Sequence, residues 1–167
     1  MTNPPRRIAL EILNKVEKER IPANELLGKY FKNKADLSYR EKAFITELVK
    51  GTLRWRDTLD WIIRQFSSYP DRRISRKLRN ILRIGIYQVF YLKNVPVSVS
   101  IYATVELAKS LTNEKIASVV NGLLRNVERN RGKIQYPSLK QNPIKACLLY
   151  TSPSPRDLST SRMPSSA

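Results

Sequence analysis

The sequence contains no histidine and a single cysteine, Cys147, among its 167 residues. These counts exclude a disulfide scaffold and a zinc site built from cysteine and histidine, and we expect no bound metal. The five glycines, at positions 28, 51, 85, 122 and 132, are too dispersed for a loop that cradles phosphates. The longest uncharged run before residue 146 is residues 94–105. It falls well short of the roughly 18 to 20 apolar residues that cross a bilayer, so we expect no transmembrane helix.

The beginning of the chain lacks the uninterrupted apolar stretch that a signal peptide uses. Arg6 and Arg7 follow two prolines, and Glu11 interrupts the apolar residues that come next. We therefore expect a cytoplasmic protein with no membrane partner.

Acidic residues are few, since 31 Lys and Arg stand against 14 Asp and Glu, a formal net charge of +17. Residues 72–83 concentrate six of these cations without one acidic residue. Such a run is often only a solvated helix face. A polyanion partner accounts better for the whole excess, because unneutralised charges of one sign repel one another in a compact fold. We expect the affinity for that partner to fall as salt rises.

Composition changes abruptly at residue 147. Residues 147–167 hold six serines, three prolines, the cysteine and three charged residues. This segment resembles translated sequencing-adapter DNA, a known contaminant of environmental gene catalogues, and we expect it to be non-native and disordered. The natural gene would then be cut after Ala146, and Cys147 would carry no function. Residues 1–146 keep nearly all the charge, with 29 Lys and Arg against 13 Asp and Glu.

Apolar residues recur at helical spacing through the rest of the chain, and breakers separate the periodic segments. Ser38 and Glu41 form a capping-box pattern, and Ser75 is a second predicted cap. Gly51 lies inside a predicted helix, which indicates either a closely packed neighbour or a bend. Six helices are predicted, over residues 5–18, 22–31, 38–66, 75–90, 98 or 100 to 111, and 116–127.

Six helices joined by mostly short connections predict an all-α fold, a compact six-helix bundle. The predicted domain covers residues 1–131. Residues 132–146 contain two prolines and no helical stripe, so they are predicted to be a linker that leaves the bundle.

Four strings carry information beyond helical periodicity. They are residues 81–88 (ILRIGIYQ), 95–96 (VP), 105–109 (VELAK) and 120–125 (VNGLLR). In order and spacing they resemble the NusB-like RNA-binding domain over nearly all of residues 5–131. The resemblance implies a helical RNA-binding module. The family that this domain defines has two branches. One consists of stand-alone transcription antitermination factors. The other consists of the N-terminal domains of RsmB-type methyltransferases, which methylate a cytosine of small-subunit ribosomal RNA at the 5-position.

Several strings are typical of the methyltransferase branch. Residues 51–56 (GTLRWR), 59–61 (LDW), 85–88 (GIYQ) and 124–125 (LR) resemble that branch, and residues 136–138 (YPS) and 142–145 (NPIK) resemble its linker. This likeness implies that a methyltransferase domain follows in the parent protein, with an S-adenosylmethionine site and catalytic cysteines, and that it contacts the bundle. The other branch implies a ribosomal-protein partner in an antitermination complex.

No catalytic site is predicted in this chain. Covalent attack on cytosine needs a thiolate, and residues 1–146 supply no thiol. The commonest general base, histidine, is missing too. We therefore expect the chain itself to be no enzyme and to hold no cofactor. A basic helical DNA-binding module is the weaker alternative, because no helix-turn-helix signature is visible.

The resemblance also suggests which residues face RNA. In the family, the first turn of the first helix and the region that opens the last helix contribute to that surface. Carried over, this gives Arg6, Arg7, Asn113, Lys115 and Val119. Three more arginines lie inside branch-typical strings, where they either hold phosphates or pack as structural side chains: Arg54, Arg56 and Arg125.

Arg83, Glu106 and Asn121 fall in the most family-typical strings but sit beside core positions. Side chains in such places usually bridge helices by hydrogen bonds or ion pairs. We expect that structural role for all three and keep an RNA-facing role as the alternative.

Overall fold

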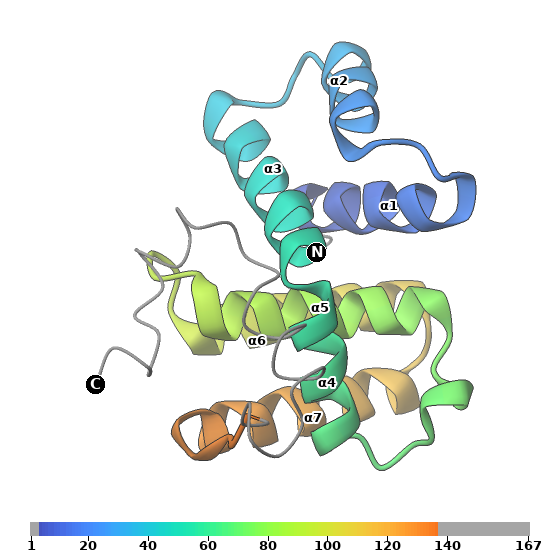
Figure 1. The fold of residues 1–167 in the computed structure, drawn as a ribbon. Helices are drawn as coiled ribbons and strands as arrows, with labels where there is room; N and C mark the ends of the chain where they lie inside the picture. The colour runs from blue at the N-terminus through green and yellow to red at the C-terminus, as the bar shows by residue number, and fades with distance from the viewer. Residues whose placement is uncertain (1–3, 137–167) are drawn as a thin grey trace.

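The computed structural model describes residues 4–136, and all regular secondary structure within that range is helical (Figure 1). The all-α prediction is therefore confirmed. The predicted tail, residues 147–167, and residues 137–146 of the predicted linker lie outside the described residues. The helices are α1 (Pro4–Glu19), α2 (Ala23–Asn33), α3 (Tyr39–Arg54), α4 (Arg56–Phe66), α5 (Arg76–Tyr91), α6 (Val97–Leu111) and α7 (Glu114–Asn130), with short 3-10 turns η1 (Asp71–Arg73) and η2 (Arg131–Lys133).

The described part of the chain holds seven α-helices rather than the predicted six, because the predicted third helix breaks at Trp55. The backbone there has φ −97° and ψ 13°, outside the helical region, and α4 starts at the next residue. The indole is buried and stacks on the ring of Tyr91 with centroids 4.7 Å apart. The break lets this large ring reach the end of α5.

Two helix starts follow the sequence signals. The Ser38 hydroxyl accepts a hydrogen bond from the Glu41 amide at 3.2 Å, and the Glu41 carboxylate accepts one from the Ser38 amide at 2.9 Å. The Ser75 hydroxyl caps α5 by accepting from the Leu78 amide at 3.2 Å. The predicted start of the fifth helix at Ser98 or Ser100 is wrong by a few residues, because α6 begins directly after Pro96 with no side-chain cap.

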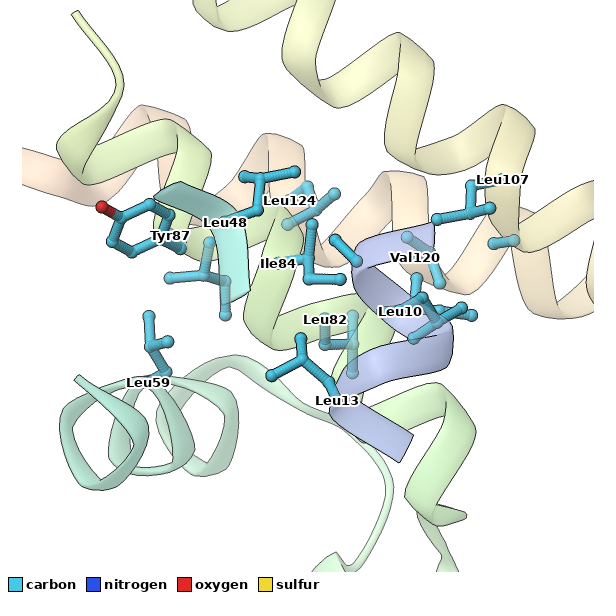
Figure 2. Packing of buried hydrophobic residues seen from close by; sticks show 14 of the residues in the cluster. Leu10, Leu13, Leu48, Leu59, Leu82, Ile84, Tyr87, Leu107, Val120 and Leu124 are labelled. Atoms are coloured by element: carbon cyan, nitrogen blue, oxygen red, sulfur yellow. The ribbon is translucent and has the colours of Figure 1, made fainter. Parts of the chain in front are cut away.

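Helix α5 lies at the centre of the fold and packs against α1, α3, α4, α6 and α7. Its apolar stripe, Ile81, Leu82, Ile84 and Ile86, is almost fully buried. Figure 2 shows two of them, Leu82 and Ile84, among leucines from neighbouring helices within one cluster. Helix α2 stands apart at the top of Figure 1 and contacts α1 and α3.

Two glycines allow helices to approach closely. A Cβ on Gly51 would overlap the ring of Tyr87, and a Cβ on Gly85 would lie 2.8 Å from Leu124 Cδ1. Of the two alternatives predicted for Gly51, the close neighbour is therefore present, whereas α3 continues through Gly51 and breaks only at Trp55. The Tyr87 hydroxyl donates to the carboxylate of Glu47 on α3.

The packed unit extends past residue 131. Arg131 Nη1 donates to the carbonyl oxygen of Val89 at 2.9 Å, which ties the end of α7 to the last turns of α5. The ring of Tyr136 stacks on Trp61 with centroids 5.2 Å apart, and Ile134 packs against the core. The first residues of the predicted linker thus belong to the bundle.

Candidate nucleic-acid interface

The two arginines at the start of α1 have opposite environments. Arg6 is only 5% exposed; its Nε donates to Gln88 Oε1 at 2.7 Å, and its guanidinium lies 4.9 Å from the centre of the Phe44 ring. Burial lowers the pKa of Arg6 to about 10. Gln88 in turn donates to Thr104 Oγ1 at 3.0 Å, so one polar chain joins α1, α5 and α6. This burial contradicts the predicted place of Arg6 among phosphate contacts.

Arg7 points to solvent, because the next residue on a helix is rotated by about 100°. Its Nε lies 3.4 Å from Glu11 Oε1, one turn along the same face, and both side chains are 45% exposed. An exposed pair of this kind contributes little to stability. Arg7 is therefore available for a phosphate.

The start of α7 presents a polar, basic end. Asn113 caps the helix, since its Oδ1 accepts from the Ile116 amide at 2.9 Å, and its residue stays exposed. Lys115 is exposed, and Val119 is half-buried one turn further on. The role of Asn113 in the fold is therefore to start α7. Because Asn113 Oδ1 already accepts this hydrogen bond from its own helix, it is occupied and does not bind a ligand.

Three further arginines were predicted from branch-typical strings. Arg54 and Arg56 are exposed on either side of the buried Trp55. Arg125 is half-buried and lies 3.5 Å from Glu128, three residues along α7. The structure thus leaves Arg54 and Arg56 at the surface, whereas Arg125 packs along its own helix.

Arg83 has the predicted helix-bridging role. Its guanidinium is buried and donates to both Asp60 carboxylate oxygens, at 2.7 and 2.8 Å, to Glu17 at 2.5 Å and to Asn80 Oδ1 at 2.9 Å. These contacts join α1, α4 and α5. Burial by itself would lower the pKa of Arg83, but the hydrogen bonds and charges of Asp60 and Glu17 outweigh it and raise that pKa.

Glu106 and Asn121 differ from Arg83. Glu106 is half-buried on α6. A hydrogen bond from Lys109 to Glu114 raises the pKa of Lys109, and the negative charge of Glu106 adds to that effect. Asn121 is exposed on α7, which contradicts a core-bridging role and leaves its RNA-facing alternative.

The basic run at residues 72–83 does not form one continuous surface. Arg79 Nη1 lies 2.6 Å from Asp71 Oδ1, and Arg83 is committed to the interior. The hydrogen bond from Arg79 lowers the pKa of Asp71. Arg72, Arg73 and Lys77 stay exposed.

A cleft along α3 was missed in the sequence. It has a volume of about 450 Å³ and is lined by residues including Tyr39, Lys42, Lys50 and Arg54. Their spacing of three, four or eight residues, which is visible in the sequence, places them on one side of a helix. Within residues 4–136 no group of three or more acidic, cysteine or histidine side chains could hold a metal ion. None of the described helices is long and apolar enough to cross a membrane.

Curated relatives fall into two groups. A probable ribosomal RNA small subunit methyltransferase B from Bacillus subtilis is 37% identical over 124 residues, 74% of this chain and 27% of that protein. The transcription antitermination protein NusB from Ruminiclostridium cellulolyticum is 31% identical over 125 residues, 74% of this chain and 86% of that protein. The chain thus spans about a quarter of the length of the methyltransferases it matches.

Solved structures agree in fold. The crystal structure of antitermination factors NusB and NusE in complex with dsRNA matches with a TM-score of 0.67 and 24% identity, covering 75% of this chain and 93% of that one. The solution structure of NusB from Aquifex aeolicus matches with a TM-score of 0.64 and 24% identity, covering 83% and 97%. The model described as NusB family matches residues 3–129, most of the sequence. The chain therefore belongs to the NusB family.

Proposed function

We propose that this chain is an RNA-binding module, the N-terminal part of a methyltransferase that modifies a cytosine of small-subunit ribosomal RNA. The observation that supports RNA binding is that some basic side chains are exposed to solvent whereas others are buried and paired. Arg7 and Lys115 are exposed where the family resemblance places RNA, whereas Arg6 and Arg83 are engaged inside the fold. Exposed cations can neutralise phosphates, which supply most of the affinity for RNA. Val119 and Arg56 would extend this surface.

Methyl transfer in the parent protein would be the work of a domain that follows residue 146. That domain would bind S-adenosylmethionine and supply the thiolate nucleophile, which residues 1–146 lack. The bundle would contact it within one chain, and the whole protein would act on RNA in the cytoplasm. In this proposal the present chain binds but does not catalyse.

Support for the methyltransferase branch comes from two strings that meet in space. Trp61 belongs to the branch-typical string at residues 59–61, and Tyr136 begins the linker string at residues 136–138. Their rings stack with centroids 5.2 Å apart. A linker that docks on α4 would set the direction in which a following domain leaves the bundle.

A second candidate is a stand-alone antitermination factor that binds RNA and a ribosomal protein. It is favoured by the coverage of relatives, because the chain spans 86% of the Ruminiclostridium NusB. Sequencing the source DNA across codon 146 separates the two. A frame that continues into a cysteine-bearing methyltransferase domain supports the first proposal, and a native stop codon near this point supports the second.

RNA binding can be tested with the whole chain by fluorescence anisotropy on labelled single-stranded RNA. We expect binding whose log affinity falls linearly with log salt, and a smaller slope for the Arg7→Gln, Lys115→Gln double variant, by about 1.4 for two lost phosphate contacts. Lys18→Gln is the matched control, since Lys18 is also exposed but lies at the far end of α1. Binding without a salt slope, or an equal effect of the control, would contradict the proposed surface.

A further inference from the structure

The cleft along α3 combines positive charge with an exposed aromatic ring. Tyr39, the first residue of the helix, is 86% exposed, an unusual position for a large ring. Lys42, Lys50 and Arg54 line the same cleft. Figure 1 shows the first half of α3 at the edge of the molecule, where no other helix crosses its outer side.

The three basic side chains and the tyrosine ring project from the same side of helix α3. At 100° per residue, Tyr39 and Lys50 are separated by only about 20° around the helix, and Lys42 and Arg54 lie about 60° to either side. The rise of 1.5 Å per residue spreads them over about 22 Å. This is a stripe long enough for several consecutive phosphates rather than for a single ion.

The cleft is lined in part by small residues and by a single carboxylate. Ala43 and Gly51 have little or no side chain there, and the ring of Tyr87 lies on Gly51. Glu47 is the one carboxylate among the lining residues, and it accepts the hydrogen bond of the Tyr87 hydroxyl. Figure 2 shows the hydroxyl of Tyr87 directed away from the other labelled side chains of the apolar cluster.

We propose that this α3 cleft is a second RNA contact, which binds a single-stranded segment by stacking a base on Tyr39 and neutralising its phosphates with Lys42, Lys50 and Arg54. Single-stranded nucleic acids are held by this combination of an exposed ring and a cationic groove. An acidic peptide would use the cations but not the ring. This inference rests on the proposed RNA binding and adds a surface of which the sequence indicated only Arg54.

The ring is tested with a matched pair of tyrosines. Tyr39→Ala should weaken binding of the whole chain to a labelled single-stranded oligouridylate by about tenfold, the effect of one lost stacking contact. It should leave binding of inorganic polyphosphate unchanged, because polyphosphate has no base. Tyr102→Ala is the control, since Tyr102 is 65% exposed on α6 but is not among the residues of the cleft. Neither variant removes a buried side chain, so both should fold.

The cations are tested by salt dependence. Lys50→Gln should lower the slope of log affinity against log salt by about 0.7, the value for one phosphate contact with a single strand. Equal effects of Tyr39→Ala and Tyr102→Ala, or equal loss of RNA and polyphosphate binding in Tyr39→Ala, would overturn the inference. Displacement of the RNA by a polyglutamate peptide that binds Tyr39→Ala as tightly as the wild type would instead assign the cleft to an acidic protein and also overturn it.

The outcome also separates this inference from the proposed function. If the wild type binds RNA and only the Arg7→Gln, Lys115→Gln variant is impaired, the α3 cleft is refuted while RNA binding stands. If the wild type binds no RNA at all, both fail.

Discussion

Replacing Arg83 with leucine tests the main polar contact between helices. The side chain is 7% exposed and holds the carboxylates of Asp60 and Glu17, which are 17% and 19% exposed. Removing one member of a buried ion pair costs about 3–5 kcal/mol, because the partner left behind stays desolvated without a counterion. Both carboxylates keep some access to water, so we expect the lower end, about 3 kcal/mol. For a domain of this size that lowers the melting temperature by about 12 °C.

A neighbouring arginine on the same helix provides the control. Arg79 is also ion-paired, to Asp71 at 2.6 Å, but Asp71 is 47% exposed. Exposed ion pairs contribute about 0–1 kcal/mol, so Arg79→Leu should cost no more than that. Urea denaturation followed by helical circular dichroism measures both variants.

A second substitution separates lost charge pairing from lost packing. In the Arg83→Leu background, Asp60→Asn removes one of the two carboxylates that lose the Arg83 guanidinium, while Glu17 keeps only a longer contact, 3.8 Å, to the exposed Arg76. We expect this double variant to recover part of the lost stability, although Asp60→Asn alone destabilises the wild type. The reasoning is refuted if Arg83→Leu costs no more than Arg79→Leu, or if Asp60→Asn recovers nothing.

Two glycines and one arginine give further predictions. Gly51→Ala should cost about 1–3 kcal/mol because its Cβ would overlap the Tyr87 ring. Gly28→Ala, with open space around it, should gain about 0.5–1 kcal/mol; equal shifts in urea midpoint would contradict this. Because burial lowers the pKa of Arg6 to about 10, its unfolded form binds more protons above that pH, and folding stability rises with pH there. The unfolding free energy of the wild type should therefore rise relative to Arg6→Met as pH passes about 10, and a constant difference would count against it.

Local signals predicted the capped helix starts at Ser38 and Ser75, and long-range contacts decided what the sequence missed. Ser38 and Glu41 are three residues apart, so their capping box is visible in the sequence and present in the structure. The break at Trp55 depends on Tyr91, which belongs to a different helix. A predictor that sees only helical periodicity reads residues 38–66 as continuous, because the apolar stripe runs through the break.

In the candidate site, too, local patterns were predictable from the sequence and long-range contacts were not. Arg6 and Arg7 are adjacent and of one residue type, and the partners that surround the buried one, Gln88 and Phe44, lie far away in the sequence. Arg83 could be assigned to the interior because it lies within the apolar stripe of α5. The α3 cleft was missed because Lys42 and Lys50 each have ordinary helical neighbours, and only their common side, beside an exposed ring, distinguishes them.

Because the buried and the exposed basic side chains respond differently to salt, RNA binding and folding stability should have different salt dependences. The contacts of Arg83 are largely shielded from solvent, so salt screens them little, whereas exposed cations such as Arg7 and Lys50 compete with salt for phosphates. Raising the salt concentration should therefore weaken RNA binding while the helices stay intact. A salt titration in which anisotropy falls and helical circular dichroism does not change thus reports the interface itself. It also gives the number of phosphates contacted, which unfolding would otherwise obscure.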